Sequence, residues 1–188
     1  ADEFSEHRPS LARDGSLLVS GFEGSEDFDA TTRITPPGAR ATGDGFVARY
    51  SDTGERIAVV RFGGSKGEFF LMPTEDAAGN IWVVGQTDSD DFPVTPDALQ
   101  PTFGGGASDA AIVVFDPGLT RILYATYLGG SGTDGGRAIA VEPDGQVFVV
   151  GHTESPNFPV TEGAFQPQIG RRSDGFVARF ALRPGAFD

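Results

Sequence analysis

The chain has 188 residues, of which 38% are hydrophobic, so it is long enough to form one domain with a buried core. Its 14 basic and 27 acidic residues give a net charge of −13, which makes nucleic acid an unfavourable partner. Cysteine is absent, which excludes disulfides, thiol catalysis and cysteine-bound metals, and no apolar run is long enough to span a bilayer.

One sequence pattern occurs three times, at intervals of about 65 residues. Its first block reads DGSLLVSG at 14–21, AGNIWVVG at 78–85 and DGQVFVVG at 144–151. Its second block reads GDGFVARY at 43–50, SDAAIVVF at 108–115 and SDGFVARF at 173–180. The chain is therefore predicted to be a single domain over 1–188, with repeats at approximately 10–65, 66–130 and 131–188.

The first copy starts with a segment in which Pro9 interrupts the expected strand. Proline cannot donate to a sheet ladder, so an edge strand is predicted at Pro9, Ser10, Leu11 and Ala12. Further strands are predicted around 16–21, 43–50 and 56–62. The intervening loop, ATTRITPPGAR, differs from the loops of the other copies and is expected to have its own conformation.

The second copy ends in a clear fourth strand, RILYATYL at 121–128. In the third copy, residues 137–143 alternate and meet Asp144-Gly145, a two-residue hairpin signal, before the strand at 146–151. Its last segment forms the second expected edge strand, made of Gly175, Phe176, Val177, Ala178, Arg179 and Phe180. No counterpart of the fourth strand follows in this copy.

The long loops of the second and third copies share the pattern V-T-x-x-A-x-Q. Thr95 and Thr161 stand where a helix N-cap would lie, so one short helical turn is predicted in each loop. Leu99 and Phe165 are expected to pack against the sheet from these turns.

The segment YATYLGGSGTDGGRAIAVEPDGQVFVVGHTESPNFPVTEGAFQ resembles the bacterial SBBP family, the seven-bladed β-propeller repeat proteins. The Tyr-Leu-Gly-Gly-Ser stretch, the Val-Val-Gly strand end and the Phe-Pro loop carry the resemblance, which covers nearly all of residues 10–181. Four-stranded units repeated in tandem indicate a β-propeller, and the resemblance implies the same all-β fold. The chain departs from the family in having three copies, which predict a propeller-like array of about three four-stranded antiparallel blades in an incomplete ring. The resemblance also implies a location in the periplasm, at the cell surface or outside the cell.

A three-bladed arc leaves sheet edges open to another chain. Three arrangements are open: a fragment of a longer propeller, a module docked on a larger assembly, and two chains closing a six-bladed ring. The first two are favoured over the third. Because the chain begins at Ala1 without a methionine or an apolar leader, it is expected to be a processed form or a piece of a longer protein.

The sequence offers no convincing catalytic set. His152 aligns with Gln86 and Phe22 in the other copies, so that position tolerates different side chains, and His7 lies in the irregular N-terminal segment. Acidic neighbours such as Glu75 and Asp76 would point to opposite faces of a strand. No catalytic residue is therefore assigned, and the chain is predicted not to be an enzyme.

Calcium is the one cofactor considered. Hard cations bind several carboxylate and carbonyl oxygens on flexible turns, and the candidate ligands are Asp88, Asp90, Asp91 and Asp134. A third acidic loop contains Glu26, Asp27 and Asp29. None of these loops has the spaced aspartates of a dedicated calcium loop, and turn formation explains the Asp-Gly pairs without a metal.

The sequence thus predicts a non-enzymatic repeat module that presents loops and strand edges to a protein partner in an exported or cell-surface bacterial assembly. Two alternatives stay open: a calcium-dependent carbohydrate-binding or adhesion module, and part of a propeller hydrolase or lyase.

Overall fold

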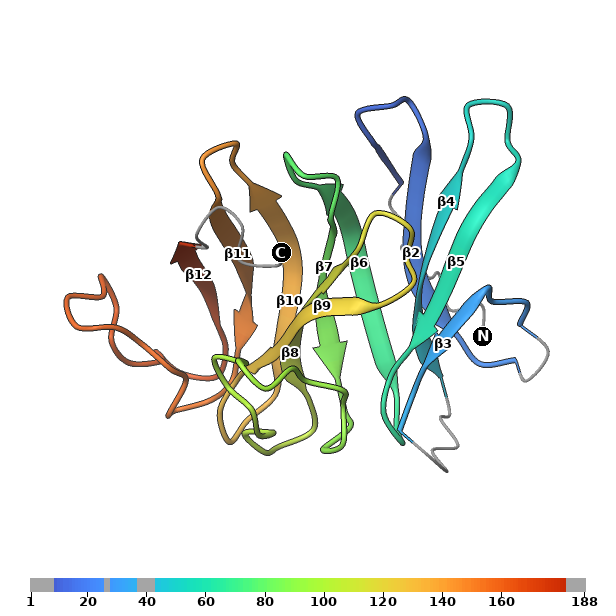
Figure 1. Cartoon of the computed structure of the whole chain (residues 1–188). Helices are drawn as coiled ribbons and strands as arrows, with labels where there is room; N and C mark the ends of the chain where they lie inside the picture. The colour runs from blue at the N-terminus through green and yellow to red at the C-terminus, as the bar shows by residue number, and fades with distance from the viewer. Residues whose placement is uncertain (1–8, 26–27, 37–42, 182–188) are drawn as a thin grey trace.

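The computed structural model describes residues 9–25, 28–36 and 43–181. Within these ranges all regular structure is β-strand, arranged in three sheets that follow one another along the chain (Figure 1). Strand pairing is antiparallel with one exception, and the described strands do not close into a barrel. The all-β prediction is confirmed.

The strands divide among the sheets in chain order. The first sheet has the order β1-β2-β4-β5-β3 and consists of β1 (Ser10–Leu11), β2 (Leu17–Glu23), β3 (Thr32–Ile34), β4 (Asp44–Tyr50) and β5 (Arg56–Phe62). The second sheet consists, in sequential order, of β6 (Glu68–Glu75), β7 (Ile81–Thr87), β8 (Asp109–Phe115) and β9 (Ile122–Leu128). The third sheet consists of β10 (Asp134–Val141), β11 (Gln146–Thr153) and β12 (Asp174–Ala181).

Each sheet opens with a tight hairpin that depends on glycine. Gly15, Gly79 and Gly145 occupy the corresponding turns with φ of 84°, 87° and 83°. A side chain is disfavoured at such φ values, which explains the small residue in all three copies. The hairpin predicted at Asp144-Gly145 is confirmed, but its loop has three residues rather than two: the Glu142 N–H donates to the Gln146 carbonyl at 2.8 Å and the Gly145 N–H to the Glu142 carbonyl at 3.0 Å.

The second sheet lies between the other two and is buried on both faces. Val83, Val113 and Phe115 face a core shared with the first sheet. Trp82, Val84, Ile112 and Val114 face a core shared with the third sheet. Every residue of β8 is buried, which accounts for its nearly continuous apolar sequence where the other copies alternate.

The loops differ from prediction in two places. The loop of the first copy forms β3, a short strand parallel to β5 that adds a fifth strand to its sheet. The turns predicted after Thr95 and Thr161 are present but are not helical: each is a single turn, in which the Ala98 N–H donates to the Thr95 carbonyl at 3.0 Å and the Ala164 N–H to the Thr161 carbonyl at 3.1 Å. Leu99 is 61% exposed and Phe165 is fully exposed, so neither packs against the sheet.

The conformation of the second-copy loop has a physical cause in the neighbouring strand. The Leu99 N–H donates to the Tyr124 hydroxyl at 3.1 Å, and the Gln100 N–H donates to Thr126 Oγ1 at 2.9 Å. The loop thus satisfies its backbone donors along β9, which removes the need for helical hydrogen bonds. The described part of the third copy has no such strand, so Phe165 lacks the surface that the prediction assumed.

Phe62 is the centre of the first core and gives a direct test of it. Its ring lies 4.7 Å from that of Phe70 and 4.9 Å from that of Phe115, measured between centroids. Phe62→Ala is expected to lower the free energy of unfolding by about 3–5 kcal/mol, measured by urea denaturation. Phe165→Ala is the matched control and should change it by less than about 0.5 kcal/mol. Equal effects of the two substitutions would contradict this packing.

Candidate functional site

The two junctions between sheets bury the same kind of acidic pair. In the first junction, Asp44 at the start of β4 lies near Glu68 at the start of β6. In the second junction, Asp109 at the start of β8 lies near Asp134 at the start of β10. All four residues are at most 4% exposed. These are the carboxyl pairs, and each joins two sheets.

A glycine lies beside each carboxyl pair. A methyl group on Gly63 would be 2.3 Å from Glu68 Oε2 and 3.1 Å from Asp44 Oδ1. A methyl group on Gly129 would be 2.4 Å from Asp109 Oδ1 and 2.9 Å from Asp134 Oδ2. The two carboxyl groups of a pair therefore converge on one small space, which a larger residue would occupy.

The second acid of each pair is held by hydroxyl and amide donors. Asp134 Oδ2 accepts hydrogen bonds from Ser155 Oγ at 2.6 Å and from the Gly130 N–H at 2.7 Å. Glu68 Oε1 accepts from Ser89 Oγ at 2.5 Å and from Thr87 Oγ1 at 2.9 Å. The same type of hydrogen bond therefore recurs at both junctions.

The two serines also hold the linkers between the sheets. Ser89 Oγ accepts from the Lys66 N–H at 2.8 Å, and Ser155 Oγ accepts from the Gly132 N–H at 2.7 Å. Each Gly-Gly-Ser linker is thus fastened to the loop after the second strand of the next sheet. This is the structural role of the repeated glycine and serine positions.

The first acids differ in their partners. Asp109 Oδ2 accepts from the Gly104 N–H at 2.6 Å and from Gln100 Nε2 at 3.2 Å. Asp44 Oδ2 instead accepts from Arg61 Nε in a buried ion pair. Arg61 lies on β5, and the equivalent position on β9 of the second sheet is occupied by Tyr127. The first pair therefore has an adjacent cation at this position that the second pair lacks.

Each carboxyl group also has one buried oxygen without a hydrogen-bond partner. The four oxygens are Asp44 Oδ1, Glu68 Oε2, Asp109 Oδ1 and Asp134 Oδ1, and no other carboxyl group in the described ranges has one. Two charged carboxylates buried side by side are strongly unfavourable. A proton held between the two carboxyl groups would relieve both the repulsion and the missing hydrogen bond.

Burial gives the pairs unusual acidities. Loss of solvent, with the neighbouring Asp44 charge as a smaller cause, raises the pKa of Glu68 to about 7. Loss of solvent and the neighbouring Asp134 charge raise the pKa of Asp109 to about 6. Each pair can therefore hold a proton under mildly acidic to neutral conditions.

The four calcium candidates do not form one site. Asp134 belongs to the second carboxyl pair, whereas the other three lie in the loop after β7. There Asp91 Oδ1 accepts from the Ser65 N–H at 2.8 Å, and Asp90 lies 3.4 Å from Lys66 Nζ. Burial raises the pKa of Asp88. Within the described part of the chain, no three His, Asp or Glu side chains are grouped to hold a metal.

The predicted edge residues lie in or beside strands of the first and third sheets. Of the N-terminal four, Ser10 and Leu11 form β1, while Pro9 precedes it and Ala12 follows it as a buried residue. β1 is one edge of the first sheet but lies beside β6, where Ser10 Oγ donates to the Pro73 carbonyl, and Leu11 is 75% exposed. The segment from Gly175 to Phe180 lies in β12, at one edge of the third sheet. In that strand Val177 is 75% exposed and Phe176 is buried.

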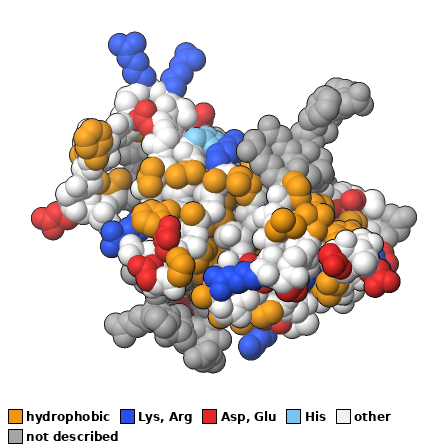
Figure 2. All heavy atoms as spheres, turned by 90° about the horizontal axis from the view of Figure 1, so that it is seen from above, with side chains coloured by type: hydrophobic (Ala, Val, Ile, Leu, Met, Phe, Trp, Pro, Cys, Tyr) orange, Lys and Arg blue, Asp and Glu red, His pale blue; other side chains and the backbone are white. Residues whose placement is uncertain are grey.

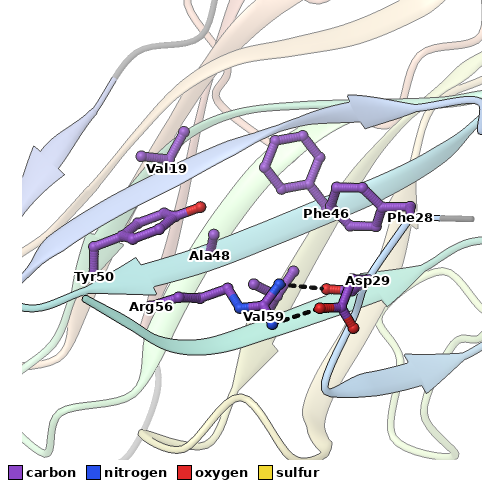
Figure 3. Close-up of a pocket in the computed structure, with 8 residues that line it drawn as sticks. All are labelled: Val19, Phe28, Asp29, Phe46, Ala48, Tyr50, Arg56 and Val59. Atoms are coloured by element: carbon purple, nitrogen blue, oxygen red, sulfur yellow. Dashed lines mark hydrogen bonds and ion pairs between the residues drawn. The ribbon is translucent and has the colours of Figure 1, made fainter. Parts of the chain in front are cut away.

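The outer face of the first sheet is hollowed. A depression of ≈ 560 Å³ is lined by Val19, Phe28, Asp29, Phe46, Ala48, Tyr50, Arg56 and Val59 (Figure 3). Asp29 and Arg56 form an ion pair of 2.6 Å at its side, and the remaining lining is mostly apolar. This composition suits contact with another apolar surface better than acid–base chemistry.

Of the two histidines, the structure describes one. His7 lies outside the described residues, as do Glu26 and Asp27. His152, on β11, has its pKa lowered by burial and by nearby Arg137. The end of the molecule seen from above has hydrophobic patches interspersed with side chains of both charges (Figure 2).

Sequence reasoning looked for acids adjacent in the chain and so missed the carboxyl pairs, whose members come from successive sheets. A signal was present: aspartate recurs at 44, 109 and 174, the same position of each copy, and an acid recurs at 68 and 134.

No protein-family model matches the chain, and no curated protein matches it. Within the described ranges there is also no helix of the length and apolarity that a bilayer crossing requires.

The carboxyl pairs predict that the protein is more stable in mild acid. The pKa values of Glu68 and Asp109 are higher in the folded protein than their ordinary values of 4.5 and 3.8. The folded state therefore binds more protons in this range. The free energy of unfolding should fall as pH rises from the ordinary to the folded pKa, which is about 6 for Asp109 and about 7 for Glu68, and should level off above that. Between about pH 5 and pH 8 the fall should be on the order of 2 kcal/mol for each carboxyl. Urea denaturation between about pH 5 and pH 8 measures this.

Amide variants identify the groups responsible. Glu68→Gln and Asp109→Asn should each reduce the difference in stability between about pH 5 and pH 8. Asp97→Asn is the control, because Asp97 is exposed and lies outside both carboxyl pairs. An unchanged pH profile in both pair variants would refute the shared proton.

Substitution of the glycine beside a pair tests the geometry. Gly129→Ala should lower the free energy of unfolding by about 1–3 kcal/mol, because its methyl group would collide with Asp109 Oδ1. For comparison, a methyl group on Gly67 would come no nearer than 3.5 Å to Asp88 Oδ2. Thermal denaturation that is equally affected by Gly67→Ala would argue against a crowded site at Gly129.

Proposed function

We propose that this chain is a non-enzymatic repeat module of the β-propeller type, which binds a protein partner through the open faces of its first and third sheets. The main support is a contrast in burial. Val84 and Ile112, buried in the second sheet, have exposed counterparts in the third sheet. In the first sheet, Val19 and Tyr50, the counterparts of two other buried positions, are partly buried and line a depression, while Ala48 and Val59 are buried at its floor.

The open face of the third sheet is called the tail face and consists of Phe148, Val150, His152, Val177 and Arg179. The register pairs Val150 with Val177, which are 38% and 75% exposed. Their counterparts in the second sheet are Val84 and Ile112, at 0% and 2% exposed, which pack against the third sheet. An apolar face of this kind favours a partner that covers it.

The open face of the first sheet is called the head face and consists of Val19, Phe46, Ala48, Tyr50 and Val59. It contains the depression described above (Figure 3). The register makes Tyr50 the counterpart of Phe115 and Val19 the counterpart of Val83. Both counterparts are fully buried against the first sheet. The head face therefore has the residue types of a docking surface.

The propeller assignment rests on the repeated junction. The second and third sheets each begin with a strand that contacts the preceding sheet: β6 contacts β2, and β10 contacts β6 and β7. Both junctions use a carboxyl pair, a Gly-Gly-Ser linker and a serine from the following loop. The resemblance to the SBBP repeats supports the same assignment and, with it, an exported or cell-surface location.

The acidic site supports a structural rather than a catalytic role. The carboxyl pairs are sealed from solvent, so a substrate has no access to them. The polar groups around them donate hydrogen bonds to the carboxyl oxygens and so fix the sheets in place. We assign the pairs to docking of successive sheets.

Site-specific photocrosslinking tests the proposed binding function. A photoreactive amino acid at position 177 on the tail face or at position 19 on the head face should give covalent adducts in extracts of the source organism. The matched control position is 99, which is exposed but lies on neither face. Adducts only at 177 and 19, lost on adding excess unlabelled chain, support the function. Equal labelling at all three positions, or no adduct, would overturn it.

A further inference from the structure

We infer that the partner of each open face is a second copy of this chain, docked head to tail: the head face of one copy covers the tail face of the next. This inference rests on the proposed function and names its partner. Three observations carry it: the equivalence of the faces, a half-built carboxyl pair and a matching pair of charges.

The first observation is that the two open faces are the two halves of an interior junction. In the first junction, the first sheet contributes Leu18, Val47 and Phe62, and the second sheet contributes Val83, Val113 and Phe115. In register, the tail face of the third sheet corresponds to the side that the first sheet contributes to this junction. The head face of the first sheet corresponds to the side that the second sheet contributes. Head-to-tail contact of two copies therefore repeats a contact that the chain already makes twice.

The second observation is that the third sheet carries the first acid of a carboxyl pair with its donors already in place. Asp174 Oδ2 accepts from Gln166 Nε2 at 2.6 Å and from the Gly170 N–H at 2.5 Å. Asp109 has the same donors from Gln100 and Gly104. Asp109 is completely buried by the sheet that follows it, whereas Asp174 is half-buried. The third sheet thus carries one acid of such a pair with its donors in place, and the second acid would come from the first strand of the following copy, whose start lies outside the described residues.

The third observation concerns an arginine that bridges sheets. Arg49 on β4 reaches the second sheet, where its guanidinium lies 3.4 Å from Glu75 Oε1 and 3.1 Å from the Pro117 carbonyl. Arg179 is its counterpart on β12, where it is exposed on the tail face. It is the group that would bridge to a following sheet.

The head face offers a partner for this arginine. The turn between β4 and β5 and the turn between β8 and β9 have the same hydrogen bond. In the first turn the Gly54 N–H donates to the Ser51 carbonyl, and in the second the Leu119 N–H donates to the Asp116 carbonyl. This equivalence puts Asp52 at the position of Pro117. Asp52 is exposed beside Tyr50, so in a head-to-tail contact Arg179 meets an acid of the second copy.

The tail face contains no acid, so a symmetric tail-to-tail contact would give Arg179 no acidic partner on that face. Head-to-tail contact pairs opposite charges and is heterologous, so each copy uses two different surfaces.

The test measures the molar mass of the purified chain in solution by light scattering and sedimentation, over a series of concentrations. The wild-type chain should form species larger than its monomer mass of 19.7 kDa. Val177→Glu on the tail face and Val19→Glu on the head face should each be monomeric alone. Their equimolar mixture should form a dimer, because one variant keeps its head face and the other keeps its tail face.

Several results would overturn the inference: a monomeric wild-type chain, either variant associating alone, or a mixture that stays monomeric. A monomeric wild-type chain would leave the proposed function standing if crosslinks at 177 and 19 join a different protein. Circular dichroism and thermal denaturation of both variants ensure that loss of association is not loss of folding.

If Val19→Glu does not fold, exchanging the charges of Arg179 and Asp52 provides a second test. Arg179→Asp and Asp52→Arg alter exposed residues, and each should weaken association about threefold. The double variant should recover wild-type association, since both charges are reversed. Failure of the double variant to recover would show that these two residues do not meet.

Discussion

At each junction between sheets, two acidic side chains are buried next to each other. Asp109 and Asp134 converge beside Gly129, and each keeps one oxygen without a hydrogen-bond partner. Such a site is tolerable only if the charge is reduced or balanced, because solvation of two buried carboxylates is lost. The first junction has Arg61 beside its pair, and the second has an uncharged tyrosine at that register position. Two solutions to one electrostatic problem thus occur within one chain.

The same constraint explains the sequence around the pairs. Each linker needs glycine where the acids converge and a second glycine where Ser89 or Ser155 approaches the chain. The serines then accept backbone N–H groups from the linker and donate to the acid. One hydroxyl thereby connects the linker, the acid and the loop of the following sheet. The repeated Gly-Gly-Ser pattern is therefore explained by the packing of the linker against the acids and serines, and not by the needs of a strand.

Much of the strand pattern could be predicted from the sequence, because alternation and Asp-Gly turns are local signals. Residues 121–128 and 146–151 were predicted as strands and lie almost wholly in β9 and β11. The loops could not be predicted in this way, since Leu99 is positioned by the Tyr124 hydroxyl of a neighbouring strand. The carboxyl pairs were missed for a related reason: their acids come from different sheets, and only the three-dimensional arrangement brings them together.

The outer edges of the sheets differ in how they are covered. In the first sheet, β3 pairs with β5 and occupies its free side. In the second sheet, the Thr95 N–H donates to the Ala125 carbonyl and the Tyr127 N–H to the Gln100 carbonyl, so a loop covers β9. Within the described residues, β12 has no comparable cover. Among the three outer edges within the described residues, β12 is thus the one whose backbone groups are open to strand addition, a common route from a β-protein to aggregates.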